Sequence, residues 1–447
     1  MTEQNAKVRS GAHSVAVPMT GWRLSAVISF LLMFALSFES VPLPIQAQIV
    51  PLTSLLALLF LPVTALRMRK TPLFQVVMAF TIYTIFHSVI ALFIDIVIRG
   101  DEVIRFTAWG RQVLALAAGL SVFMVLRRTL VDVSDQFVIS SVVAGASPAI
   151  ALALLNVLWG FSGSTIAGHV VTQVRATLIP LGFTAPSRAS GLSLEPSHFA
   201  FYLAVIVVPV CFARLVTSKR HLPWIALLGL VMAVFVWTVS ITGFVVLAVF
   251  VVAGMLFGPR RRVFAIATIV LVLLVGGFLI LYPSNYAVWQ LRSLLFSEWS
   301  LSITNRFYST FGPFINSLSS YTLIGYGLGG TSTHFLEIVP AVAQEDIAVV
   351  SWEGMPNLRT LVGRILAESG LLGLVMFAGM VVLGLKELQH AHRVMADGLS
   401  KNLLGIARLT LFGIIVGATI GYGSFALPYL WIWLAWIDSR YILSRLR

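Results

Sequence analysis

A polar segment at residues 188–198 holds the residue types best suited to chemistry, and it runs directly into an apolar stretch. It contains an arginine, a glycine, a glutamate and a histidine. Pro196 suits the first position of a helix, with Glu195 or Ser193 beside the cap. The free N–H groups of a helix N-terminus, together with Arg188, predict an anion site. The alternative is an ordinary loop that leads into a capped helix.

The amino-acid composition indicates whether this segment works in water or in a lipid bilayer. Of the 447 residues, 58% are hydrophobic and only 11% are charged, which excludes a soluble protein of this size. Apolar runs of roughly 17–25 residues recur along the chain, the length that crosses a bilayer. We therefore expect an all-α fold, a polytopic transmembrane helix bundle that forms a single integral membrane domain over residues 1–447. Cys211 is the only cysteine, which excludes a disulfide framework within the chain.

About twelve transmembrane helices are predicted from these runs. Their approximate ranges are 22–38, 48–66, 73–97, 107–126, 137–159, 197–215, 223–239, 241–257, 263–282, 365–385, 403–423 and 425–441. The tight turns near Ser240 and Ser424 separate the closest pairs.

The distribution of charge predicts the orientation of the bundle. The net charge of +13 would suit nucleic acid, but the basic residues gather in alternate connections, as positive-inside orientation requires. These connections lie near residues 7–9, 67–70, 127–128, 214–220, 260–262, 386–401 and 440–447. Both termini are therefore expected in the cytoplasm, with membrane lipid head groups as partners and no nucleic acid.

Two connections on the opposite, outer side are long, at about 160–196 and 283–362, and loops of this length usually carry function. The larger lies between the ninth and tenth predicted helices. Its aromatic residues follow a helix-like rhythm, which predicts amphipathic helices along the membrane interface. These residues are Trp289, Trp299, Phe307, Phe311, Phe314 and Tyr321.

Three arginines on the outer side need an explanation, because positive-inside orientation disfavours them there. They are Arg188, Arg306 and Arg359. The planar guanidinium binds phosphate oxygens in pairs, so the set suits a lipid-linked phosphate or pyrophosphate. The alternative is that each arginine pairs with a loop acid. The candidate acids are Glu298, Glu337, Glu345, Asp346 and Glu353.

Other kinds of site find little support in the sequence. The glycine-rich stretch at residues 325–330 lacks the strand and βαβ unit of a dinucleotide site, and we expect a tight loop with close backbone approach. No cluster has zinc-ligand spacing, and we predict neither a metal nor a cofactor.

Several segments resemble, in order, those of the O-antigen ligase/polymerase-like superfamily. Arg188-Ala-Ser-Gly191 followed by Glu195-Pro196-Ser197 is similar to its RxxG and EP(N/S) segment. Ser240-Ile-Thr-Gly243, Asn305-Arg306 with the glycine-rich stretch, and Leu366-Ala-Glu368-Ser-Gly370 are similar to later segments. The match covers about residues 137–390.

The resemblance implies a membrane-embedded, polyprenyl-phosphate-dependent glycosyltransferase of the bacterial inner membrane, with its active site on the periplasmic face. Such enzymes transfer a glycan from undecaprenyl pyrophosphate without a metal. The family's pyrophosphate-binding arginines match Arg188 and Arg306. Undecaprenyl-pyrophosphate-linked donor and acceptor glycans are the implied partners, with a chain-length regulator protein as a further one.

One departure from the family pattern bears on the reaction. Where the ligases carry a His-Asn pair, this chain has Arg359-Thr360. We therefore expect Arg359 to bind phosphate, and a polymerase of O-antigen or exopolysaccharide repeat units rather than an O-antigen ligase that transfers glycan to lipid A core. Glu195 is the first candidate for the base, followed by His334 and Glu353. A transporter of lipid-linked oligosaccharide is the rival class, disfavoured by two long outer loops and no visible repeat.

Overall fold

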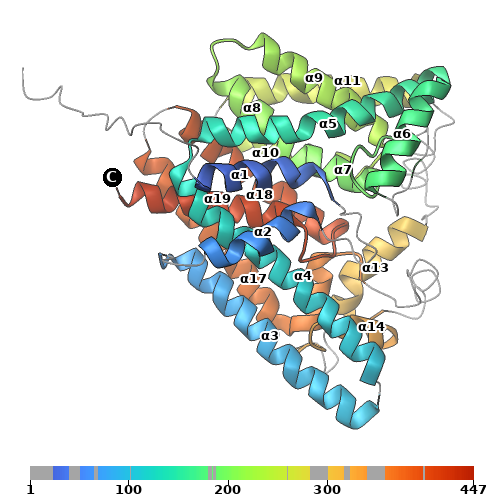
Figure 1. Ribbon diagram of the computed structural model, residues 1–447, viewed down its shortest axis with the longest axis vertical. Helices are drawn as coiled ribbons and strands as arrows, with labels where there is room; N and C mark the ends of the chain where they lie inside the picture. Colours follow the sequence, from blue (N-terminus) through green and yellow to red (C-terminus); the bar gives the residue numbers. More distant parts are fainter. Residues whose placement is uncertain are drawn as a thin grey trace, which may run out of the picture.

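The computed structural model describes residues 24–39, 51–64, 69–100, 102–179, 184, 188–258, 260–281, 301–316, 323–339, 358–395 and 398–446. These residues form helices and no β-strand (Figure 1).

The first half of the chain supplies helices that pack side by side. They are α1 (Leu24–Phe34), α2 (Leu52–Thr64), α3 (Pro72–Arg99), α4 (Glu102–Thr129), α5 (Asp135–Ser162) and α6 (Thr165–Leu178). Short 3-10 turns, Ala35–Ser37 and Leu130–Asp132, extend α1 and α4. Thr71 and Ser134 cap α3 and α5 by accepting N–H bonds with their hydroxyls, and Gly100 and Gly163 end these helices in the left-handed conformation.

The second half begins with a long helix that contains a π-helical segment. This helix comprises α7 (Pro196–Tyr202), the π segment Leu203–Val207 and α8 (Val208–Thr217). The remaining helices are α9 (Leu222–Thr238), α10 (Ile241–Phe257), α11 (Arg261–Leu281), α13 (Leu301–Asn316), α14 (Gly330–Thr333), α15 (Phe335–Ile338), α17 (Leu361–Val394), α18 (Leu399–Ile420) and α19 (Pro428–Ser444).

Each of the twelve predicted apolar segments coincides with a helix of the structure. Among the described residues, six helices are long and apolar enough to cross a membrane, and four shorter ones are also apolar. The six are Pro72–Ile98, Arg105–Asp132, Asp135–Ser162, Pro196–Thr217, Leu361–Val394 and Leu399–Ile420. A membrane-embedded helical protein is therefore supported, while the number of twelve spans stays a prediction.

The helix from Pro196 to Thr217, which we call the central helix, is the most enclosed of the long apolar helices. Of its apolar window, 94% is buried, the largest share among the six long apolar helices. The polar segment singled out in the sequence leads directly into this helix, with Glu195 as the N-cap and Pro196 at the first position as expected. Residues at its start are thus held by a rigid, enclosed element.

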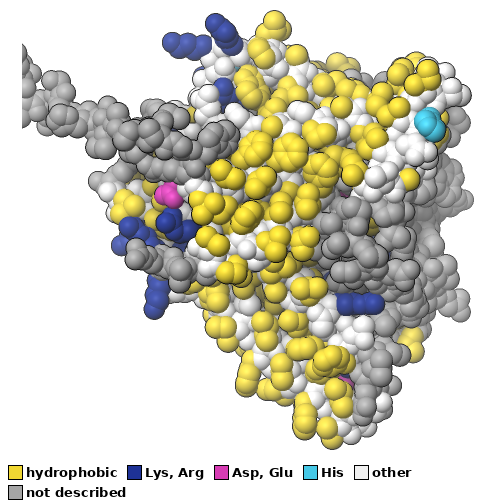
Figure 2. Space-filling model, in the orientation of Figure 1, with side chains coloured by type: hydrophobic (Ala, Val, Ile, Leu, Met, Phe, Trp, Pro, Cys, Tyr) yellow, Lys and Arg dark blue, Asp and Glu magenta, His cyan; other side chains and the backbone are white. Residues whose placement is uncertain are grey.

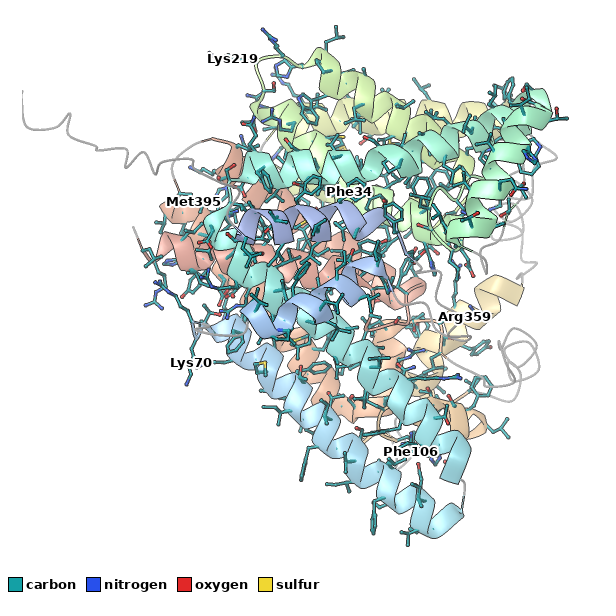
Figure 3. All side chains as sticks on the ribbon, viewed as in Figure 1. Phe34, Lys70, Phe106, Lys219, Arg359 and Met395 are labelled. Atoms are coloured by element: carbon teal, nitrogen blue, oxygen red, sulfur yellow. The ribbon has the colours of Figure 1, made fainter. Side chains whose placement is uncertain are left out.

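The two ends of the bundle differ in the connections they carry. Lys70, Lys219 and Met395 lie at one end, while Phe106 and Arg359 lie at the other (Figure 3). The face between the ends is largely hydrophobic, and most visible Lys and Arg side chains lie towards the first end (Figure 2). Three of the connections predicted on the same side of the membrane therefore lie at the same end of the bundle. Which end faces the cytoplasm stays a prediction.

Within the large predicted loop, the structure describes helix α13, while the place of this loop at the outer membrane interface stays a prediction. Helix α13 exposes Phe307, Phe311 and Phe314 and buries Ser309 and Thr310 on its opposite face. The other predicted aromatic positions, Trp289, Trp299 and Tyr321, lie outside the described residues. The first long loop also contains a helix, α6, that was not expected from the sequence.

The glycine-rich stretch is a tight loop with close backbone approach, as predicted. Gly325, Gly327 and Gly329 all have positive φ values. The loop lies against a break in α17 at Gly370, where the Tyr326 and Gly327 N–H groups donate to the carbonyls of Ala367 and Glu368 at 2.8 Å each. A Cβ at Gly325 would lie 2.4 Å from the Gly370 nitrogen, so both positions need glycine.

The predicted orientation of the two ends of the bundle can be tested by labelling introduced cysteines. In a Cys211→Ala background, which removes the single buried thiol, we expect a membrane-impermeant maleimide to label His169→Cys from outside intact cells. Lys219→Cys should react only after the membrane is opened. Both positions are exposed, so access to the thiol depends on membrane side. Labelling of Lys219→Cys in intact cells would contradict the orientation, and the Cys211→Ala parent serves as the unlabelled control.

Candidate functional site

The N-terminal end of α7 brings a second acid beside Glu195. Glu39 follows the 3-10 turn after α1 and is 1% exposed. Its Oε2 accepts the Leu194 N–H at 3.0 Å, and its Oε1 lies 2.6 Å from Nδ1 of His198. Ser197 Oγ donates to Glu195 Oε2 at 3.1 Å. Two carboxylates and an imidazole therefore meet at the start of the central helix.

The loop before α7 is held by a buried arginine. Arg175, on α6, donates to the carbonyls of Gly191 at 2.7 Å, Ser193 at 3.0 Å and Leu194 at 3.3 Å. Burial lowers the pKa of this guanidinium to about 10, while Glu39 acts in the opposite direction, so the side chain remains charged at neutral pH. Gly191 has a positive φ, and the loop could not follow this path with a bulkier residue there. Arg175 therefore fixes the loop that carries Glu195.

Arg188 belongs to the loop before α7, and its side chain contacts the turn between α9 and α10. Its Nε donates to the Thr238 carbonyl at 3.1 Å and its Nη2 to the Val239 carbonyl at 3.2 Å. Carbonyls at a helix C-terminus carry partial negative charge and attract a cation. The structure thus gives Arg188 a role in holding this turn, and its predicted contact with pyrophosphate stays a prediction.

Arg306 reaches the same turn from the amphipathic helix α13. Its Nη1 donates to the hydroxyl of Thr242, in the first turn of α10. Thr310, one helical turn further on, bonds to the Thr419 carbonyl and to Thr360 Oγ1. Gly363 allows α13 to approach closely, because a Cβ there would lie 2.0 Å from the Ser309 carbonyl oxygen. Arg188 and Arg306 thus contact the same turn, at Val239 and Thr242, which are three residues apart.

Arg359 lies just before α17, at the end of the bundle opposite Lys70 and Lys219 (Figure 3). It is partly buried, and its backbone passes Gly423, where a Cβ would lie 3.0 Å from the Arg359 carbonyl carbon. The neighbouring Tyr422 donates its hydroxyl to the Ser197 carbonyl and lies against the His198 ring, with centroids 5.4 Å apart.

Contacts around His198 and electrostatic interactions with Glu195 link six residues, which we call the Glu195 cluster: Glu39, Glu195, His198, Arg306, Arg359 and Tyr422. Burial acts to raise the pKa of Glu195, but His198, Arg359, the Ser197 hydroxyl and Arg306 outweigh it and lower the pKa. Burial lowers the pKa of Arg306, against the influence of Tyr422 and Glu195. Burial raises the pKa of Tyr422, so its hydroxyl keeps its proton. Glu195 is therefore an ionised acid that interacts with two arginines, Arg306 and Arg359.

His334 belongs to a second cluster with different partners. Its Nε2 lies 3.1 Å from Asp95 Oδ1, its Nδ1 lies 3.3 Å from Glu337, and its ring stacks on Tyr326. Arg105 binds Asp95 at 2.7 Å and the carbonyls of Tyr326 and Leu328. These contacts tie the glycine-rich loop to α3 and α4. The remaining candidate base, Glu353, lies outside the described residues.

Sequence reasoning noted His198 without giving it a role, and it missed three further residues of this region. Glu39, Thr242 and Tyr422 come from chain segments far from residue 195. A signal existed for Glu39, since it is an acid directly after the first apolar run. Thr242 belongs to the Ser240–Gly243 segment noted in the sequence, whereas Tyr422 had no such signal. Only packing brings Thr242 to Arg306 and Tyr422 to His198.

Comparison with models of known protein families gives no match, and no curated protein is significantly similar to this sequence. In the described part of the chain, no three His, Cys, Asp or Glu side chains are grouped so as to hold a metal ion. The chemistry of the Glu195 cluster must therefore be argued from its geometry.

The close packing of α13 on α17 at Gly363 predicts that substitution of this glycine destabilises the protein. Gly363→Ala should destabilise the protein by about 1–3 kcal/mol, because the new methyl group would press on the backbone of Ser309. Gly379→Ala, on the same helix, is the matched control, since its Cβ would meet only Val76 Cγ1 at 3.8 Å. Thermal unfolding in detergent measures both. Equal melting temperatures for the two variants would contradict the close packing of α13 on α17.

Proposed function

We propose that this protein is a polyprenyl-pyrophosphate-dependent glycosyltransferase that polymerises O-antigen or exopolysaccharide repeat units in the bacterial inner membrane. The observation that supports this best is that Arg306 and Arg359 both interact electrostatically with Glu195, at one end of a bundle of apolar helices. A lipid-linked pyrophosphate has the matching form, since its charge lies at the membrane surface and its tail stays in the bilayer.

The proposed leaving group is a pyrophosphate, so positively charged side chains can stabilise it as it departs. The acceptor hydroxyl attacks the anomeric carbon of the donor glycan, and the bond to undecaprenyl pyrophosphate breaks. Negative charge then builds on the departing pyrophosphate. Guanidinium groups fixed beside it stabilise that charge and accelerate the reaction. Arg306 and Arg359 are the residues we assign to this task, with Arg188 holding the turn that presents Thr242 to Arg306.

The resemblance of the sequence to the O-antigen ligase/polymerase-like superfamily agrees with this assignment. Arg359 occupies the place of the ligase histidine, which favours a second lipid-linked repeat unit over lipid A core as the acceptor. In this proposal the Glu195 cluster faces the periplasm, both termini are cytoplasmic, and a chain-length regulator protein acts on the growing polymer.

Replacing either arginine should impair polymer formation. Loss of one charge-assisted phosphate contact costs on the order of 1.5–3 kcal/mol. That corresponds to a rate loss of roughly tenfold to over a hundredfold for Arg306→Ala and Arg359→Ala. Arg359→Lys keeps the charge without the paired fork and should retain some polymer. Polymer length is read on gels from cells that lack the chromosomal gene and carry each variant.

The control for these variants is Arg393→Ala, which removes the same charge from an exposed position near Met395, at the opposite end of the bundle. It should leave polymer length unchanged. Wild-type chain lengths in Arg306→Ala and Arg359→Ala cells, at normal protein abundance, would contradict the assignment of both arginines.

A further inference from the structure

His198 and Glu39 form a dyad at the start of the central helix. Nδ1 of His198 lies 2.6 Å from Glu39 Oε1, and the Glu39 side chain is 1% exposed. The other carboxylate oxygen of Glu39 accepts the Leu194 N–H. One oxygen of Glu39 is thus hydrogen-bonded and the other lies within ion-pair distance of His198, which restricts the orientation of the carboxylate. The His198 side chain remains 16% exposed, so it lies at the edge of the enclosed region.

We propose that His198 is the general base of the transfer reaction and that Glu39 is the positioning residue that orients it. This inference rests on the proposed glycosyltransferase function. A carboxylate that faces Nδ1 favours the tautomer with the proton on that nitrogen, which leaves the lone pair on Nε2. Within the described part of the chain, no hydrogen bond occupies Nε2, so it can receive a proton from substrate.

The environment of the ring supports this assignment. Glu39, Glu195 and Arg306 are the charged groups that act on His198. Tyr422 packs against the ring and is itself tied to the Ser197 carbonyl, which fixes the ring between α7 and the end of α18. The two acids offset the positive charge that the ring gains when it takes a proton. The base therefore lies within the same cluster as the proposed phosphate-binding arginines.

The two described alternatives for the base fit less well. Although burial acts to raise the pKa of Glu195, His198, Arg359, Ser197 and Arg306 together lower it, and an acid with a lowered pKa is a weak base. His334 is 3% exposed and both of its ring nitrogens face carboxylates, those of Asp95 and Glu337. Glu195 instead balances the arginines when no donor is bound.

The reaction step is balanced without a further reagent. The acceptor oxygen forms a bond to the anomeric carbon of the donor as its proton passes to Nε2 of His198. The carbon–oxygen bond to undecaprenyl pyrophosphate breaks, and its electron pair leaves with the pyrophosphate. The imidazolium, stabilised by Glu39, then releases the proton to water. No oxidant or reductant takes part.

The test separates chemistry from binding and folding. Lipid-linked repeat units that accumulate in cells lacking this protein are extracted and added to purified protein in nanodiscs, and the rate of linkage formation is measured. Binding of undecaprenyl pyrophosphate alone is measured on the same samples. His198→Asn keeps an N–H donor for Glu39, so the buried carboxylate retains its partner.

We expect His198→Asn to lose about 100-fold to 10,000-fold in rate, the usual contribution of a general base, with binding and melting temperature unchanged. Glu39→Gln should lower the rate with binding preserved, whereas a purely structural role would change binding and melting together. His169→Ala, an exposed histidine on α6, is the matched control and should behave as wild type.

A rate for His198→Asn within about threefold of wild type would overturn the assignment, because loss of a general base lowers the rate far more than that. A large loss confined to Glu195→Gln would transfer the role to Glu195. If the wild-type protein itself neither binds undecaprenyl pyrophosphate nor links the extracted units, the proposed function fails instead. The binding measurement thus distinguishes failure of the base from failure of the function.

Discussion

Removing a charged side chain from water is costly unless a partner accompanies it, and this constraint organises the bundle. In the described part of the chain, three arginines are fully buried, and each interacts with an acid and binds backbone carbonyls outside its own helix. Arg105 pairs with Asp95 and binds the carbonyls of Tyr326 and Leu328. Arg127 pairs with Asp438 and binds the Arg69 carbonyl, and Arg175 interacts with Glu39 and binds the Gly191 carbonyl. The same interaction that compensates each charge therefore fixes a loop on the helices.

Arg306 and Arg359 differ from those three because they are only partly buried and surround an ionised acid at one end of the bundle. Their positions depend on close backbone contacts at glycine. Gly363 brings α13, and with it Arg306, against the start of α17, while Gly423 lies beside the backbone of Leu358 and Arg359. Packing that allows no side chain at these points sets the separation of the two cations, and so the size of the anion they could hold together.

The two clusters give the acids and histidines different possible uses. In the cluster around His334, Arg105 and His334 attach the glycine-rich loop and the turn after it to α3 and α4. In the Glu195 cluster, charge of both signs, a partly exposed imidazole and a protonated tyrosine meet at the start of the most buried long helix. Proton transfer and stabilisation of an anion both need such a mixture held rigidly, which is consistent with the proposed glycosyltransferase.

Hydrophobic periodicity and length alone determined the helical class, the position of the apolar segments and the amphipathic face of α13, because these depend on neighbours along the chain. The cap at Glu195 and Pro196 and the tight glycine loop were predictable for the same reason. The pairing of His198 with Glu39, the contact of Arg306 with Thr242 and the separation of His334 from Glu195 were not. Those contacts join segments up to hundreds of residues apart, and only the packing of helices in three dimensions decides which polar side chains share a buried space.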